Sequence, residues 1–335
     1  MSETVFVALS GGVDSTYALF KLKSQGFNVV ALTMDVGLPV SREWIEAAKH
    51  AAFSMGVMLN VVNLKDEFQK YVVDYFVKEY LSGRTPNPCA VCNRYIKFGL
   101  LREHALSMGA DYYATGHYAC LSDGRLMRAK DRNKDQSYFL CLVEREKFSS
   151  VLFPMCSVRK SEAILAVRDM VLNVPRESQE VCFLQGGDYR TLLMDKVGTK
   201  RGRFVDVNGN VIGEHDGFFL FTIGQRRGLG KTFGKPMYVV DIVPSENTVV
   251  LGDEKHLFKD RMKVSSINWF IDLKNIRFPL DVEVKIRSQH RPVKALLYED
   301  GMVEFSEPQR AVTPGQVACF YRGDLVVAGA VIDYI

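Results

Sequence analysis

The chain has 335 residues, 47% of them hydrophobic, and a formal net charge of +4. This length allows two or three hydrophobic cores, and no apolar run approaches the roughly 18 residues of a membrane span. The N-terminus lacks the basic segment of a secretory signal, so we expect a cytoplasmic protein with no membrane partner. Seven cysteines over this length do not indicate a disulfide framework, and we expect reduced thiols.

The first half of the sequence alternates between apolar β-forming runs and segments with helical spacing. The expected strands cover residues 4–9, 27–34, 57–64 and 111–118. The expected helices cover residues 16–26, 41–56 and 98–109, with Ser41 as an N-cap and Gly26 and Gly56 as helix ends. Strands that alternate with helices form βαβ units, so the sequence predicts an α/β fold with a parallel sheet.

Turn signals replace the helical spacing from about Gly202 onward. Asn208-Gly209 and Asp300-Gly301 each separate two short β-forming runs, as in tight hairpins, and residues 317–332 form a third candidate hairpin. We therefore expect two small β-rich modules after the α/β domain, the last of them a β-barrel. The expected domains are residues 1–200 with a helical extension, residues 201–263 and residues 264–335.

A glycine-rich segment, SGGVDS at residues 10–15, connects the first expected strand to the first expected helix. Its backbone amides can converge on an anion with the help of the helix N-terminus, and its two serines add hydroxyl donors. Asp14 suits a phosphate site where a magnesium ion bridges, as in Mg-ATP. The segment lacks the GK[ST] of a Walker loop and the GxGxxG of a dinucleotide site. Alone, it would favour an ordinary strand-to-helix turn capped by its Ser and Asp side chains.

The stretch PNPCAVCNRYIKF, at residues 86–98, carries Cys89 and Cys92. A structural zinc site usually needs two such pairs, and the sequence has no second pair. A thioredoxin-like pair would open a helix shortly after a strand in a domain of its own. The remaining cysteines lie beside apolar residues, where a buried core thiol is the default interpretation. They are Cys120, Cys141, Cys156, Cys182 and Cys319.

Seven motifs occur in a fixed order along almost the whole chain. They are SGGVDS, PNPxxxCNxxIKF, ATGHYA (114–119), KDQSYFL (134–140), VCF (181–183), GQRRGLG (224–230) and TPGQ (313–316). Together they resemble the tRNA-specific 2-thiouridylases, the MnmA family of the PP-loop ATP pyrophosphatases. The resemblance implies replacement of the C2 oxygen of the wobble uridine by sulfur in tRNAs for Lys, Glu and Gln. It also implies cleavage of ATP to AMP and pyrophosphate.

The resemblance assigns roles to residues at the matching positions. Cys92 takes the position of the nucleophile, and Cys182 that of the persulfide intermediate. The ATP-binding positions are Ala8, Leu9, Ser10, Gly11, Gly12, Val13, Asp14, Ser15, Met34 and Gly116. The target base is lined by Asn87, Pro88 and Cys89. The other tRNA-contacting positions are His117, Lys134, Asp135, Gln136, Arg287, Ser288 and Gln316.

The implied chemistry explains these residue types. The uridine C2 oxygen is a poor leaving group, so ATP with Mg²⁺ adenylates it and a sulfur nucleophile then attacks C2. The target base must leave its stack in the anticodon stem-loop to reach both ATP and the sulfur nucleophile. The expected partners are therefore tRNA and a sulfur donor such as a cysteine desulfurase or a sulfur-relay protein. We expect the enzyme to be a monomer.

Cys89 departs from the commoner family pattern, which has aspartate at this position. Three cysteines and one open iron are the arrangement of a [4Fe–4S] cluster with a free coordination site. Cys89, Cys92 and Cys182 are thus candidate ligands of a cluster that binds external sulfide. In the other route, Cys182 carries a persulfide and Cys92 resolves it as a disulfide. Both routes stay open at this point.

Two other functions compete with tRNA thiolation. A PP-loop amide-forming ligase that acts on a small molecule would use a glutaminase and would not need Cys92. A noncatalytic, metal-stabilised RNA-binding protein would not turn over ATP, and the SGGVDS segment argues against it.

Overall fold

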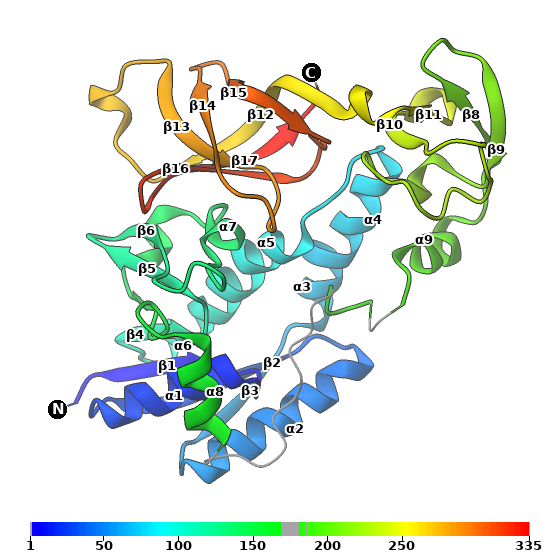
Figure 1. Cartoon of the computed structure of the whole chain (residues 1–335). Helices are drawn as coiled ribbons and strands as arrows, with labels where there is room; N and C mark the ends of the chain where they lie inside the picture. The colour runs from blue at the N-terminus through cyan, green and yellow to red at the C-terminus, as the bar shows by residue number, and fades with distance from the viewer. Residues whose placement is uncertain (1, 169–180, 185–186, 335) are drawn as a thin grey trace.

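The structure is a computed structural model that describes residues 2–168, 181–184 and 187–334. Its N-terminal domain contains the strands β1 (Thr4–Ala8), β2 (Asn28–Asp35), β3 (Leu59–Asn63), β4 (Tyr112–Thr115) and β7 (Val151–Leu152). They form a parallel sheet in the order β3-β2-β1-β4-β7 (Figure 1). The prediction of an α/β domain with a parallel sheet is confirmed.

Strand β1 lies in the centre of this sheet and is buried on both faces. Val5 and Val7 point into one cluster of core residues, and Phe6 points into another on the opposite face. Such two-sided burial explains why the strand reads as a continuous apolar run. Two of the covering helices are α1 (Val13–Ser24) and α2 (Pro39–Ser54), and their small and aliphatic residues fill the cluster around the two valines.

Helix α2 begins earlier than the sequence indicated, and the prediction that Ser41 is its N-cap was wrong. Leu38 is the N-cap and Pro39 takes the first helical position, which the fixed φ of proline favours. Ser41 lies in the first turn, where its hydroxyl accepts a hydrogen bond of 3.1 Å from the backbone N–H of Leu38. Gly26 and Gly56 both have positive φ directly after their helices, as predicted.

A run of helices follows β3 and leads toward the C-terminal part of the chain (Figure 1). It consists of α3 (Lys65–Phe68), α4 (Asp74–Leu81), α5 (Pro88–Cys92) and α6 (Arg102–Ser107), with the π-helical segments η1 (Gln69–Val73) and η2 (Asn93–Leu101). The other α-helices are α7 (Ser137–Leu140), α8 (Lys160–Arg168) and α9 (Tyr189–Val197). The 3₁₀ segments are η3 (Arg145–Phe148), η4 (Phe218–Leu220), η5 (Pro244–Glu246), η6 (Glu254–Leu257) and η7 (Leu273–Asn275).

Two β modules complete the fold, as predicted. The central sheet contains β8 (Gly202–Asp206), β9 (Val211–His215), β10 (Tyr238–Val243) and β11 (Thr248–Gly252). The barrel contains β12 (Phe258–Trp269), β13 (Leu280–Lys285), β14 (Val293–Leu297), β15 (Met302–Arg310), β16 (Val317–Arg322) and β17 (Leu325–Asp333). Pairing of β12 with β17 closes these six strands. The three predicted hairpins are confirmed as β8–β9, β14–β15 and β16–β17.

The barrel is joined to the N-terminal domain by a hairpin of that domain. Strands β5 (Ala119–Ser122) and β6 (Arg125–Arg128) extend the barrel sheet through the pairing of β6 with β17. The barrel and the N-terminal domain are therefore joined by backbone hydrogen bonds as well as by side-chain contacts. Among the described residues, no helix combines the length and the apolar character that a membrane span needs.

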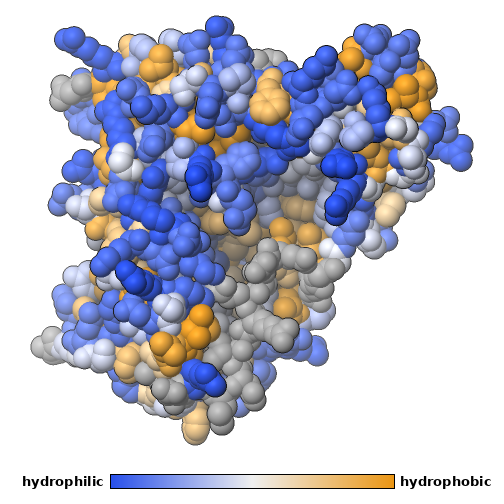
Figure 2. All heavy atoms as spheres, viewed as in Figure 1, coloured by the Kyte–Doolittle hydropathy of each residue, from blue (hydrophilic) through white to orange (hydrophobic). Residues whose placement is uncertain are grey.

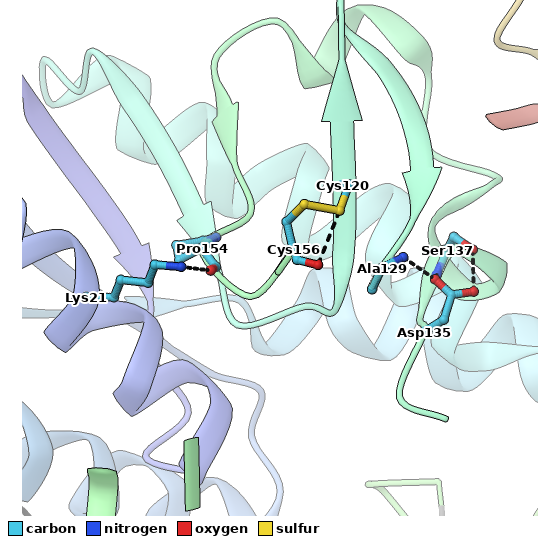
Figure 3. Close-up of a disulfide and its surroundings, with 7 residues drawn as sticks. All are labelled: Lys21, Cys120, Ala129, Asp135, Ser137, Pro154 and Cys156. Carbon is cyan, nitrogen blue, oxygen red and sulfur yellow. Dashed lines mark hydrogen bonds between the residues drawn. A yellow bond between two sulfur atoms is a disulfide. The ribbon is translucent and has the colours of Figure 1, made fainter. Parts of the chain in front are cut away.

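A disulfide joins Cys120 in β5 to Cys156 in the loop after β7 (Figure 3). The expectation that these two cysteines are core thiols was wrong, whereas Cys141 and Cys319 are free and fully buried, as expected. The two bonded residues are 36 positions apart in sequence, with Cα atoms 4.7 Å apart. The β5–β6 hairpin, which was not predicted from the sequence, brings the two cysteines together.

Gly329 in β17 packs directly on the backbone of Cys141, and this contact generates the first prediction. A Cβ at position 329 would overlap the Cys141 carbonyl and lie 2.7 Å from its sulfur. We expect Gly329→Ala to lower the free energy of unfolding by about 2 kcal/mol or more, because both partners are buried backbone. Gly213→Ala in β9 is the control, since a Cβ there would meet mainly the flexible side chain of Lys231. Equal urea midpoints for the two variants would contradict the packing argument.

Candidate active site

The SGGVDS segment forms a tight turn between β1 and α1. The hydroxyl of Ser15 accepts a hydrogen bond from the backbone N–H of Ser10 (3.2 Å), lies 3.1 Å from the Ser10 hydroxyl and donates to the carbonyl of Gly12 (3.1 Å). Gly12 is the N-cap of α1, so the first amides of this helix open toward the turn. The geometry is that of a preformed anion site at a helix N-terminus.

Two glycines allow this turn to be packed closely. Gly11 has φ +75°, and a Cβ there would overlap the backbone of Ala47 in α2. Gly116, directly after β4, lies against the turn itself, because a Cβ would be 2.6 Å from the nitrogen of Ser15 and 2.7 Å from the carbonyl carbon of Asp14. The loop after β4 and the turn after β1 therefore form one continuous wall.

A cavity of about 200 Å³ opens beside this wall. Seven of the ten predicted ATP-binding residues line it: Ala8, Leu9, Ser10, Asp14, Ser15, Met34 and Gly116. Gly11, Gly12 and Val13 are not among the lining residues. The cavity is also lined by His117 and Gln136, which the resemblance placed in the tRNA contact, and by Leu32, Thr33, Trp44, Lys97, Leu101 and Thr115, which sequence reasoning missed. Figure 2 shows the molecular face hollowed between its lower and upper parts, with hydrophobic side chains visible there.

Asp14 is half-buried in the cavity wall and bears on the predicted use of magnesium. Its carboxylate forms an ion pair with Lys160 at the start of α8 (2.6 Å) and accepts a hydrogen bond from the hydroxyl of Tyr118 (3.0 Å). A carboxylate and serine hydroxyls supply the oxygen ligands that Mg²⁺ prefers. The lining residues therefore fit a magnesium nucleotide, with Asp14 as the charged ligand, and ion pairing with Lys160 offsets its repulsion of phosphate.

Cys89 and Cys92 lie on the short helix α5, not on a loop. Asn87 caps α5 by accepting a hydrogen bond from the N–H of Ala90 (3.1 Å), and Pro88 takes the first helical position. The helix then continues into η2 and α6. The asparagine–proline pair is the signal from which this helix start could have been predicted.

The barrel holds the segment that leads into this helix. The side-chain amide of Gln316 donates hydrogen bonds to the carbonyls of Thr85 (3.1 Å) and Pro86 (3.0 Å), and the N–H of Thr85 donates to the carbonyl of Pro314 (2.8 Å). Gly315 lies against the same segment, since a Cβ there would be 2.8 Å from the carbonyl oxygen of Thr85. The turn at Pro314–Gln316 thus packs closely against the Thr85–Pro86 segment, although the two are far apart in sequence.

The three candidate thiols influence one another. Cys92 is buried, Cys182 is half-buried and Cys89 is exposed. Desolvation raises the pKa of Cys92 to about 12 and that of Cys182 to about 11, and repulsion from the neighbouring thiols adds to both shifts. Desolvation also raises the pKa of Cys89. At neutral pH the thiols are therefore protonated and need a cation to become nucleophiles.

The described residues do not show a metal site formed by these cysteines. Within residues 2–168, 181–184 and 187–334, no three or more His, Cys, Asp or Glu side chains converge closely enough to hold a metal ion. We therefore derive no step through a [4Fe–4S] cluster.

The predicted tRNA-contacting residues divide into two groups. Asp135 accepts hydrogen bonds from the N–H of Ala129 and the N–H and hydroxyl of Ser137 (Figure 3), and Gln136 accepts one from the N–H of Tyr118. Arg287 donates to the carbonyls of Ile223 and Ala311 and to the hydroxyl of Thr313. These side chains, like Gln316, hold the fold together. Lys134 and Ser288 are half-buried. Whether any of them contacts tRNA stays a prediction.

His117 lies where the cavity approaches the thiols. Its Nδ1 is 2.8 Å from the hydroxyl of Thr115, so the ring has a fixed orientation. Burial, followed by the positive charge of Lys97, holds the pKa of His117 well below its usual range. The imidazole is therefore neutral at physiological pH and can exchange hydrogen bonds with a nucleotide or base without adding charge.

Comparison with known proteins assigns the family. Family models described as tRNA methyl transferase HUP domain, tRNA methyl transferase PRC-barrel domain and Aminomethyltransferase beta-barrel domain match residues 3–186, 190–253 and 259–332. The tRNA-specific 2-thiouridylase MnmA of Clostridium kluyveri is 39% identical over 359 residues, which cover 99% of this chain and 100% of that protein. The MnmA of Carboxydothermus hydrogenoformans is 40% identical over 98% of this chain and 97% of its own length.

The chain belongs to the tRNA-specific 2-thiouridylase family. The resemblance inferred from the seven motifs is confirmed. A solved structure of the U34-tRNA thiolase NcsA from Methanococcus maripaludis with its [4Fe-4S] cluster is also similar, at 19% identity and a TM-score of 0.36. That match covers 59% of this chain and 68% of the other, and so low a likeness carries no argument about a cluster here.

We expect Gly116→Ala to weaken ATP binding by about tenfold or more. The added methyl group would displace the turn at Ser15 and so misplace its hydrogen-bond donors. Isothermal titration calorimetry with ATP and Mg²⁺ measures the effect, and Gly213→Ala in the central sheet is the control. An unchanged dissociation constant for Gly116→Ala would mean that this wall does not bind ATP.

The raised pKa of Cys182 generates a third prediction. Iodoacetamide reacts with the thiolate, so the rate of Cys182 alkylation should rise about tenfold per pH unit between pH 7 and pH 9, with no plateau. The same peptide in urea-unfolded protein is the control and should level off near pH 9. Peptide mass spectrometry gives both rates. A plateau near pH 8 in the folded protein would show that Cys182 is an ordinary thiol.

Proposed function

We propose that this protein transfers sulfur to C2 of the wobble uridine of tRNA in an ATP-dependent reaction. The observation that carries the proposal is the placement of the SGGVDS cavity beside the helix that bears Cys92. Lys97 lines that cavity, and its charge acts on all three candidate thiols. A nucleotide site and a sulfur site therefore converge in one place, as an adenylation followed by sulfur transfer requires.

The first step is activation of the base. The uridine C2 oxygen attacks the α-phosphorus of ATP, an O–P bond forms, and pyrophosphate leaves. The turn at residues 10–15 and the start of α1 supply N–H and hydroxyl donors for the phosphates. Asp14 would hold the magnesium ion, which supplies charge neutralisation when bound. The neutral ring of His117 is placed to face the base or the nucleotide without repelling either.

The second step is sulfur transfer. The outer sulfur of a Cys182 persulfide attacks C2, and AMP leaves with the original oxygen. The Cys92 thiolate then attacks the Cys182 sulfur, which releases 2-thiouridine and leaves a Cys92–Cys182 disulfide for an external dithiol to reduce. The persulfide route accounts for the roles of two thiols and needs no metal. Cys89 borders the base in this scheme.

The remaining features of the proposal concern partners and location. Asn87, Pro88 and Cys89 would face the target base, and Lys134, Arg287 and Ser288 would lie toward the anticodon stem-loop. We propose a division into three domains, at residues 1–200, 201–263 and 264–335, with the two β modules on the tRNA side. A cysteine desulfurase or a sulfur-relay protein would supply the persulfide. We place the enzyme in the cytoplasm and expect it to act as a monomer.

The competing amide-forming ligase is not favoured. Such an enzyme needs the nucleotide turn but has no use for thiols beside it, and the family to which the chain belongs is named for tRNA thiolation.

Thiolation of unmodified tRNA tests the proposal directly. Thiolated tRNA is retarded on a gel that contains an organomercurial, so wild-type protein with ATP, Mg²⁺ and a desulfurase should produce a shifted band. Cys92→Ala and Cys182→Ala should each lower the rate by more than about 1,000-fold, because each removes a sulfur that forms or breaks a bond. Cys319→Ala is the control, since that thiol is buried and is not among the groups that shift the pKa of Cys92 or Cys182. ATP-independent thiolation, or full activity of Cys92→Ala, would contradict the mechanism.

Cys89 distinguishes the two sulfur routes. If Cys182 carries a persulfide, Cys89→Asp should keep the rate of thiolation within about threefold of wild type. In that route, residue 89 forms no covalent bond to the transferred sulfur. Iron and sulfide content after anaerobic purification should be negligible in both proteins. Stoichiometric iron that is lost in Cys89→Asp together with activity would establish the cluster route instead.

A further inference from the structure

Lys97 is a half-buried lysine in the wall of the nucleotide cavity. Neither the resemblance to the family nor the proposed mechanism assigns Lys97 a role. It shares the cavity wall with Ser10 and Ser15 of the turn after β1 and with His117 after β4. Its side chain thus enters the space where ATP phosphates would lie.

The local helix geometry connects Lys97 to the cysteine pair. Lys97 lies five residues after Cys92, and the segment between them, η2, is π-helical. Hydrogen bonding from i to i+5 brings residues five apart nearly above one another, whereas in an α-helix of 3.6 residues per turn they would be over a third of a turn apart. The wide winding therefore turns Lys97 toward the side of the helix that bears Cys92.

The electrostatics of the thiols agree with this placement. Among the residues that the structure describes, Lys97 is the one cationic side chain that opposes the rise in the pKa of Cys89, of Cys92 and of Cys182. Its charge also helps to lower the pKa of His117. The ammonium group is thus near the three sulfurs and the imidazole at once.

The charges around the cavity leave Lys97 available for an anion. Among the residues that the structure describes, Lys97 makes no ion pair, whereas Asp14, which also lines the cavity, forms an ion pair with Lys160. A half-buried ammonium without an acidic partner is costly unless an anion binds beside it. Two such anions are expected in this reaction, a phosphate group and a sulfur anion.

We infer that Lys97 is a shared cation that binds the phosphate charge of ATP and also stabilises the sulfur anion that attacks C2. The inference rests on the proposed function and extends it. While ATP is intact, the ammonium is drawn to the phosphates and the thiols are left less reactive. After pyrophosphate leaves, the same ammonium stabilises the sulfur anion. Lys97 keeps its own protons throughout, and the proton of the thiol or persulfide goes to solvent.

Sharing one cation couples the two sites. Two anions that use the same ammonium weaken each other, and the coupling must be equal in both directions. Bound triphosphate should therefore slow the reaction of the thiols with electrophiles. This coupling would delay the attack of sulfur on C2 until the uridine has been adenylated.

The test compares Lys97→Met with Lys97→Arg and uses Lys147→Met as the matched control. Lys147 lies close to the same helix near Gly99 but pairs with Glu103, and it does not line the cavity. Two quantities are measured without tRNA: the dissociation constant of ATP by calorimetry, and the rate of Cys182 alkylation at pH 8 by peptide mass spectrometry. The alkylation is repeated with a nonhydrolysable ATP analogue. Neither measurement depends on turnover, so both remain readable even if thiolation itself is absent.

We expect Lys97→Met to weaken ATP binding and to slow Cys182 alkylation, each by about tenfold, the effect of losing one nearby charge. The analogue should slow alkylation more strongly in wild type than in Lys97→Met, because only wild type has the shared cation. Lys97→Arg should regain most of the ATP affinity and most of the alkylation rate of wild type. Lys147→Met should match wild type in both measurements. A Lys97→Met protein that binds ATP weakly but alkylates normally, or the reverse, would overturn the sharing of one cation. Circular dichroism checks the fold, and Lys97→Gln serves if the methionine variant does not fold.

Discussion

The position of helix α5, which carries Cys89 and Cys92, depends on two hydrogen bonds from the amide of Gln316 to the carbonyls of Thr85 and Pro86. Pro88 begins helix α5, and Pro86 also lacks an N–H group, so the helix does not extend back through Thr85 and Pro86, whose carbonyls need donors from elsewhere. The barrel supplies them from a turn more than 200 residues further along the chain. In the mechanism we propose, the C-terminal barrel is therefore part of the active site, because it sets where Cys89 and Cys92 begin their helix.

The chemistry of the site follows from the burial that this arrangement produces. Thiols enclosed by protein are protonated, which protects them from stray electrophiles but leaves them unreactive. Reactivity must then come from a cation that the helix itself provides, and Lys97 on the π-helical segment meets that need. Ser10 and Ser15 of the turn after β1 line the same cavity as Lys97. In the mechanism we propose, adenylation and sulfur transfer thus share one set of charges.

Local patterns in the sequence predicted much of this fold. The buried run of β1, the glycine-rich turn and the Asn-Gly and Asp-Gly hairpins each carry their signal within a few residues. The disulfide between Cys120 and Cys156 and the contact of Gly329 with Cys141 could not be predicted, because they depend on how distant elements pack. Lys97 was missed for a related reason. Only the π-helical winding turns it toward Cys92, and the lysine itself resembles any other on a helix surface.

The central claim is that ATP activates the C2 oxygen of the uridine and that a protein-held sulfur displaces it. The most direct measurement follows that oxygen. A tRNA anticodon stem-loop carrying ¹⁸O at C2 of the wobble uridine is incubated with the enzyme, ATP and a sulfur donor, and the AMP is analysed by mass spectrometry. The account predicts AMP that is heavier by one ¹⁸O atom for each 2-thiouridine formed. Unlabelled AMP with thiolated product would contradict it, because the oxygen would then have left without being adenylated.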